Sequence, residues 1–259
     1  MAAQSGSSNL TSRIRSRFFS RRPKLTPLES WYLNALNYQL RRSKLKTSPF
    51  GNYYEFGVGW GSTMSKYLRA LAVFCRGKSL RMEDFRIFGF DSFEGLPSPR
   101  DARDSLISWP KGAFAVSEDT ILERVRKEAG GKALVRLVRG FFDESLTNGL
   151  RTELSRYPPS IVTVDVDYYS SAKTVLEWLR PILVSGVIFY FDDIWSFHGN
   201  PLYGELAAIQ EFNDRNEGFL TPFPILGMTG YAYVYSKKDF EYVTKSEGES
   251  PIGATSVKP

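Results

Sequence analysis

Three glycines alternate with larger residues in the segment YYEFGVGWGSTM, residues 53–64. Gly57, Gly59 and Gly61 directly follow a run of apolar and aromatic residues that is typical of a buried strand. A glycine turn between a strand and a helix lets the backbone approach a ligand closely. A dinucleotide, a phosphate and a sulfonium nucleotide all use such a turn, and each implies a different chemistry.

The acids around these glycines narrow the choice of ligand. Glu55 stands just before the first glycine, and Asp91 ends the next predicted strand, well beyond the roughly 20 residues typical of a dinucleotide site. The turn also lacks the G-x-G-x-x-G spacing of a dehydrogenase and the G-K-[ST] of a phosphate loop. Glu55 can accept a hydrogen bond from an ammonium group, so the turn favours a cofactor that carries an amino acid and a ribose.

Two further turns carry residues suited to a nucleoside. Asp91 ends a predicted buried strand in IFGFDSFEGLP, where it can accept hydrogen bonds from both ribose hydroxyls or cap the following segment. VRGFFDESL places Gly140, Phe141 and Phe142 at the next turn. A flat ring such as adenine can stack there, although such aromatics also fill hydrophobic cores.

Four carboxylates end two predicted buried strands. SIVTVDVDYYSS brings Asp165 and Asp167 to the end of one strand, and GVIFYFDDIW brings Asp192 and Asp193 to the end of the next. Carboxylates at one sheet edge repel one another and lose hydration unless something neutralises them. A divalent cation prefers such hard oxygen ligands. The pattern therefore favours a metal site over helix caps and solvated loop acids, with Asp165 and Asp167 expected on one face of the strand.

The elements that must position these residues alternate between strand and helix. We expect strands at residues 53–58, 86–91, 133–139, 160–167 and 186–192, and helices at 27–42, 62–74, 118–128, 172–179 and 202–213. This alternation predicts a parallel sheet covered on both faces, with the ligand turns at its carboxyl edge. The segment TPFPILGMTGYAYVYSK predicts a closing antiparallel hairpin around GMTG.

Composition excludes other classes of protein. No apolar run approaches the roughly 18 residues that span a bilayer. Cys75 is the only cysteine, which excludes an internal disulfide and predicts a reducing, cytoplasmic compartment. The net charge is +6, but ten of the Lys and Arg residues and only one acid lie within residues 1–46. We therefore expect no specific nucleic-acid binding by the folded part.

The chain divides into three parts. Residues 1–24 are predicted to be a disordered basic arm, residues 25–240 one catalytic domain, and residues 241–259 a flexible tail. The arm is either a solvated tail or a contact with anionic surfaces, and its composition also resembles an organelle transit peptide. The sequence leaves homo-oligomerisation open.

Taken together, these motifs resemble the macrocin O-methyltransferase family, class I S-adenosylmethionine-dependent enzymes that methylate sugar hydroxyls on natural products. The resemblance covers about residues 50–235 and rests on EFGVGWGS, DSFEGLP, KGAFAVSEDTI, VRGFF, VDVDYYSS and GVIFYFDD. It implies a Rossmann-like, mostly parallel α/β sheet of seven strands with helices on both faces and a C-terminal antiparallel hairpin. It also implies dependence on Mg2+ or another divalent cation.

The resemblance further implies residue roles. Cofactor contacts are expected at Glu55, Gly57, Gly59, Gly61, Ser62, Asp91, Ser92, Phe93, Gly140 and Phe142. Within that set, Glu55, Gly57 and Gly61 hold the methionine part and Asp91 holds the ribose. Asp165, Asp192 and Asp193 are expected to bind metal, with Asp165 also in the catalytic group and Asp167 as the base. Val166 and Ser185 stand where family members commonly have glycine.

The expected reaction is displacement of a methyl group from sulfonium by a hydroxyl oxygen of a small molecule or glycan, with a metal and a carboxylate assisting. His198, the only histidine, is a further candidate base or acceptor contact. Residues 98–119, with Trp109, Lys111 and Phe114, form a candidate lid or acceptor wall. A dehydrogenase, an inactive methyltransferase-like scaffold and a phenol or catechol methyltransferase are the alternatives.

Overall fold

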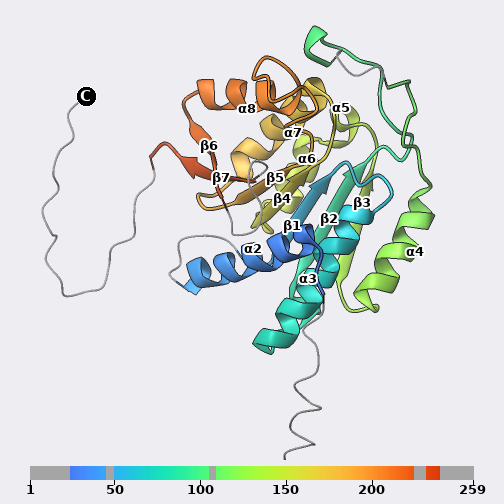
Figure 1. Ribbon diagram of the computed structural model, residues 1–259, viewed down its shortest axis with the longest axis vertical. Coiled ribbons are helices and arrows are strands. Elements are labelled where there is room, and N and C mark those ends of the chain that lie inside the picture. The colour runs from blue at the N-terminus through green and yellow to red at the C-terminus, as the bar shows by residue number, and fades with distance from the viewer. Residues whose placement is uncertain (1–23, 45–49, 105–108, 225–231, 240–259) are drawn as a thin grey trace, which may run out of the picture.

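The computed structural model describes residues 24–44, 50–104, 109–224 and 232–239, and the described strands form one sheet (Figure 1). The strands are β1 (Asn52–Phe56), β2 (Arg86–Asp91), β3 (Leu134–Arg139), β4 (Ile161–Val164), β5 (Ile188–Phe191), β6 (Gly218–Pro222) and β7 (Ala232–Lys237). Their order is β3-β2-β1-β4-β5-β7-β6. Strands β1 to β5 pair in parallel, and β7 runs antiparallel to both β5 and β6. The predicted mostly parallel sheet with an antiparallel finish is confirmed.

The sequences of the central strands explain their position. β4 reads IVTV and β5 reads IFYF, and every residue of both strands is buried. Continuous runs of β-branched and aromatic residues suit parallel strands that are covered on both faces. The carboxyl ends of β1, β4 and β5 therefore meet at one protected edge.

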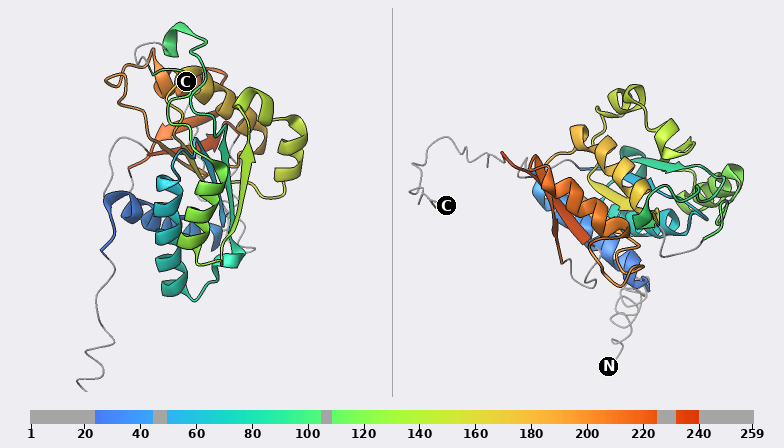
Figure 2. Two further views of the ribbon diagram at one scale, coloured as in Figure 1. Left: turned by 90° about the vertical axis from the view of Figure 1, so that its right-hand side faces the viewer. Right: turned by 90° about the horizontal axis from the view of Figure 1, so that it is seen from above.

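Helices cover both faces of the sheet (Figure 2). One hydrophobic core joins a face of the sheet to α2 (Pro27–Lys44), α3 (Ser62–Lys78) and α4 (Glu118–Ala129). The second core joins the other face to α6 (Asn148–Leu154), α7 (Tyr169–Leu179) and α8 (Gly204–Asp214). Successive side chains of β1 point to opposite faces of the sheet, so Tyr53 packs into the first core and Tyr54 into the second.

Helix α2 is fastened to the sheet by one buried amide. The Gln39 side chain donates to the backbone carbonyls of Ser160 and Gly186, both at 2.8 Å. These carbonyls lie just before β4 and β5, so α2 spans the amino ends of the two strands that carry the acids. The helix predicted at residues 27–42 is thus an integral part of the domain.

Several boundaries differ from those predicted from the sequence. β4 ends at Val164, and Asp167 adopts a left-handed backbone with φ 57°, so strand alternation does not place Asp165 and Asp167 on one face. Helix α7 begins at Tyr169, earlier than expected, and α6 and the short helix α5 (Phe142–Ser145) were not predicted. β6 begins at Gly218, and the GMTG turn lies outside the described residues, as do most of the predicted arm and tail.

Candidate functional site

A pocket of about 600 Å³ lies at the carboxyl edge of the parallel strands. The segments that follow each of the five strands β1 to β5 contribute to its lining. The glycine turn after β1 and the acids after β4 and β5 therefore face one common space. This is the convergence that the sequence pattern predicts.

The glycine turn after β1 needs its first glycine for close packing. Gly57 has φ +79°, and a Cβ atom there would lie 1.7 Å from the backbone oxygen of Asp165. Gly59 has φ +48°, but a Cβ atom there would meet nothing within 4 Å. Gly57 thus lets β1 and β4 approach each other at their ends, whereas Gly59 presents its backbone to open space in the pocket.

Asp91 ties this turn to the end of β2. One oxygen of its carboxylate accepts the backbone N–H of Gly59 at 2.8 Å, and the other accepts that of Phe93 at 2.7 Å. The backbone carbonyl of Asp91 accepts the N–H of Gly140 at 2.9 Å. Asp91 therefore links the turns after β1, β2 and β3, while its side chain still lines the pocket.

The four predicted acids all line the pocket, and hydrogen bonds order one of them. The carboxylate of Asp193 accepts the backbone N–H of Asp167 and the hydroxyl of Ser196, each at 3.0 Å. The backbone N–H of Asp193 donates to Glu205 at 2.9 Å. The turns after β4 and β5 are thus joined through Asp193, and Glu205 is a fifth carboxylate at this edge.

Burial and the repulsion between neighbouring carboxylates raise the pKa values of Asp165, Asp167, Asp193 and Glu205. Burial raises the pKa of Asp167 to about 7, with further contributions from the charges of Asp193 and Asp192. Burial and the Asp192 charge hold the pKa of Asp165 well above its ordinary value. The pKa of the fully buried Glu205 is also raised well above normal, by burial and then by Asp193. Such a cluster is stabilised by cations or by shared protons.

The oxygen donors of these acids suit Mg2+ in chemical type. Among the described residues, however, no three His, Cys, Asp or Glu side chains come together closely enough to form a metal centre. Asp192 also shares a hydrogen bond of 2.9 Å with the hydroxyl of Tyr190. The donor set fits a hard cation, and the assignment of Asp165, Asp192 and Asp193 as ligands stays a proposal.

Four predicted site residues do not line the pocket: Glu55, Gly61, Phe93 and His198. Glu55 is fully buried, and its carboxylate accepts the hydroxyl hydrogen of Tyr53. Gly61 caps helix α3 with φ 70°, and Phe93 is buried in the first core. His198 is exposed on the loop after β5, with φ 55°.

The other predicted cofactor contacts, Gly57, Gly59, Ser62, Asp91, Ser92, Gly140 and Phe142, do line the pocket. So do Arg100, Asp101 and Lys173, which the sequence motifs did not reveal. The ion pair between Arg100 and Asp143, at 2.8 Å, joins the segment after β2 to the turn after β3. No local pattern distinguishes these charged residues from a solvated surface, because their partners are distant in sequence.

Comparisons with known proteins agree with this geometry. The family model of the macrocin-O-methyltransferases (TylF) matches residues 44–225. The calicheamicin methyltransferase CalS11 is similar in structure, with a TM-score of 0.60 and 26% identity over 90% of this chain and 88% of that chain. The O-methyltransferase NovP shares the fold, with a TM-score of 0.53 and 19% identity over 80% and 79% of the two chains. No curated protein sequence matched.

No helix in the described part of the chain has the length and apolar character that crossing a bilayer requires.

Proposed function

Because the chain belongs to the macrocin-O-methyltransferase family, we propose that it transfers a methyl group from S-adenosylmethionine to a hydroxyl group of a sugar. One observation carries the proposal: a single pocket is lined both by the glycine turn with Asp91 and by the four acids after β4 and β5. The first set suits a nucleoside-bearing cofactor, and the second suits the activation of a hydroxyl group. Their shared space allows a donor and an acceptor to meet.

The cofactor end of the pocket is assigned from its backbone and its charge. Gly59 faces open space, and Asp91, fixed by two backbone N–H groups, retains lone pairs that can accept the ribose hydroxyls. Phe141 and Phe142 line the pocket next to Asp91 and offer ring faces to adenine. S-adenosylmethionine would supply an electrophilic methyl group on a positively charged sulfur.

The acceptor end is assigned to the acids. Asp167 would accept the proton that the acceptor hydroxyl loses when it takes the methyl group. A pKa of about 7 suits a base that works near neutral pH. Asp165, Asp192 and Asp193 would hold Mg2+, which lowers the pKa of a bound hydroxyl.

The acceptor class is tested by labelled methyl transfer. Methyl-tritiated S-adenosylmethionine is incubated with simple methyl glycosides, nucleoside diphosphate sugars, glycosylated extracts and catechol, with Mg2+ present. The proposal predicts label on a sugar oxygen and little label on catechol. Label on catechol alone would contradict the sugar assignment and indicate a phenol methyltransferase, which uses the same metal and acid chemistry.

The basic N-terminal segment lies outside the described residues, and its role is a separate proposal. Residues 1–23 contain five arginines and no acidic residue, and this composition suits contact with an anionic surface such as a membrane of acidic lipids. Deleting residues 1–23 should abolish salt-sensitive binding to vesicles containing phosphatidylserine and leave cofactor affinity unchanged. Equal vesicle binding by both proteins would contradict this role.

A further inference from the structure

The fully buried Asp104 lies outside every motif that the proposed function uses. It belongs to the segment after β2 that lines the pocket. We call residues 96–104 and 109–114, which precede and follow the undescribed residues 105–108, the wall segment. Two backbone hydrogen bonds of 2.9 Å, Leu96 N–H to Ala113 and Gly112 N–H to Leu96, join its two ends. The wall segment contributes Leu96, Pro97, Arg100, Asp101, Ala113 and Phe114 to the pocket.

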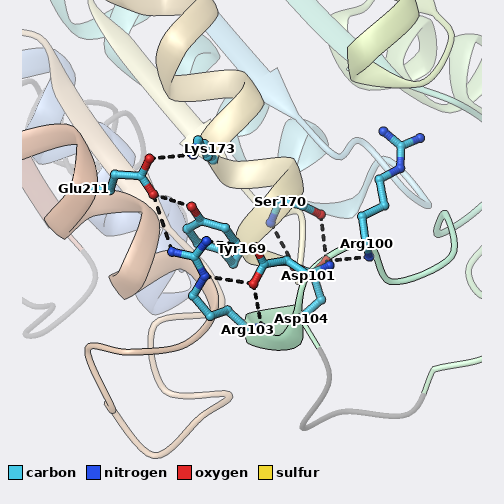
Figure 3. Close-up of polar contacts among 8 residues, drawn as sticks. All are labelled: Arg100, Asp101, Arg103, Asp104, Tyr169, Ser170, Lys173 and Glu211. Atoms are coloured by element: carbon cyan, nitrogen blue, oxygen red, sulfur yellow. Dashed lines mark hydrogen bonds and ion pairs between the residues drawn. The ribbon is translucent and has the colours of Figure 1, made fainter.

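The carboxylate of Asp104 accepts four hydrogen bonds (Figure 3). Two come from within the wall segment, from the backbone N–H groups of Arg100 at 2.9 Å and Asp101 at 3.0 Å. The other two come from the backbone N–H and the hydroxyl of Ser170, both at 2.8 Å. An ionised carboxylate with four donors makes a strong and geometrically defined junction.

Ser170 lies in the first turn of α7, where backbone N–H groups lack partners within the helix. The residue before the helix, Tyr168, makes no capping side-chain hydrogen bond. Asp104 therefore supplies the cap from the wall segment, and its negative charge faces the positive end of the helix dipole. The same helix begins just after Asp167, so one carboxylate joins the pocket wall to the turn that carries the proposed base.

A second set of contacts fastens the same stretch to α7 and α8 (Figure 3). The Arg103 guanidinium lies 3.5 Å above the centre of the Tyr169 ring and pairs with Asp101 through two bonds of 2.8 Å. Glu211 of α8 pairs with Arg103 at 3.5 Å, accepts the Tyr169 hydroxyl and pairs with Lys173 at 2.5 Å. These ion pairs are partly exposed to water and therefore stabilise the junction only weakly. The hydrogen bonds of the buried Asp104 are shielded from water and are the main contacts of the junction.

We propose that Asp104 is a positioning residue that fixes the wall segment against α7 and so completes the cofactor end of the pocket. Arg100 connects Asp104 to the proposed cofactor site, because its backbone N–H donates to Asp104 and its side chain pairs with Asp143. Asp143 follows Phe141 and Phe142, the ring faces assigned to adenine. The inference rests on the proposed function for the identity of the ligand.

The test compares Asp104→Asn with the wild type and with Asp119→Asn, an exposed aspartate in the first turn of α4. An amide at Asp104 turns an N–H group toward donors, so the junction loosens. Calorimetry should show that the Kd for S-adenosylhomocysteine rises roughly tenfold or more. With saturating S-adenosylmethionine, kcat should fall by a smaller factor. Trypsin should cut after Arg100 about tenfold faster, and Asp119→Asn should match the wild type throughout.

If Asp104→Asn yields no folded protein, Ser170→Ala takes its place, since it removes one of the four donors and should weaken binding by about threefold. A folded variant with a lower Tm but an unchanged Kd would overturn the proposal, and so would unchanged tryptic cleavage. Failure of the wild type to bind S-adenosylhomocysteine would instead refute the proposed cofactor. The cleavage comparison would then still decide whether Asp104 fixes the wall.

Discussion

The carboxylate of Asp91 holds the backbone N–H of Gly59 at 2.8 Å, so the acid that ends β2 fixes the glycine turn that follows β1. A second bond, from Phe93 at 2.7 Å, fixes the carboxylate itself. The residue predicted to bind a ribose thus also shapes the turn predicted to hold the rest of the cofactor. Substituting it should affect both contacts at once.

The first prediction concerns two glycines of that turn. Gly57→Ala should lower the free energy of unfolding by on the order of 3 kcal/mol or more, because its Cβ atom would lie 1.7 Å from the Asp165 backbone oxygen. Gly59→Ala is the matched control, with a positive φ but open space at Cβ, and should cost about 1–2 kcal/mol. Urea unfolding measures both. Equal losses would show that the β1 and β4 ends do not pack as described.

The second prediction concerns pH and Glu55. Burial raises the pKa of Glu55 to about 8 from an ordinary 4.5. The folded protein therefore keeps this proton between about pH 4.5 and pH 8, while the unfolded chain releases it, and stability falls as pH rises through that window. Glu55→Gln removes this dependence.

Urea unfolding of the ligand-free proteins between pH 5 and pH 9 checks this effect. The stability of Glu55→Gln relative to the wild type should increase toward pH 8 by on the order of 1 kcal/mol or more. Parallel pH profiles for the two proteins would show that Glu55 ionises normally in the fold.

The third prediction concerns the metal. A chelator should abolish methyl transfer and leave the Kd for S-adenosylhomocysteine nearly unchanged, because Asp91 and the glycine turn need no cation. Asp192→Asn should lower kcat at least about tenfold. In chelator it should melt at a higher temperature than the wild type, since one charge repelling Asp165 is removed.

The exposed Asp214→Asn, at the end of α8, is the control for that loss of charge and should behave as the wild type. Full turnover in excess chelator would exclude the metal role. The carboxylates would then act by orienting the acceptor and taking its proton.

The fold was predictable because its signals are local. The strand expected at residues 86–91 is β2, and the acids after β4 and β5 reach one pocket because parallel strands end at one edge. The short helices α5 and α6 offered too few turns for a helical period to show. Asp167 escaped the strand pattern because its backbone is left-handed.

The missing part of the site depends on contacts between residues far apart in the chain. Asp104 caps helix α7 by accepting hydrogen bonds from Ser170, 66 residues later in the chain. Glu205 accepts the backbone N–H of Asp193 across the loop after β5. Neither acid differs in its local sequence from a solvated one. Only the assembled sheet edge shows that both are buried and bonded.

We propose that S-adenosylmethionine binds in the pocket that Gly59 and Asp91 line, and calorimetric titration tests this binding most directly. The wild type should bind S-adenosylmethionine and S-adenosylhomocysteine at one site per chain. Asp91→Ala should bind both roughly tenfold or more weakly, because it loses a charge-assisted acceptor and frees the turn. Absence of binding heat with either ligand in the wild type, or equal affinity in Asp91→Ala, would contradict the account.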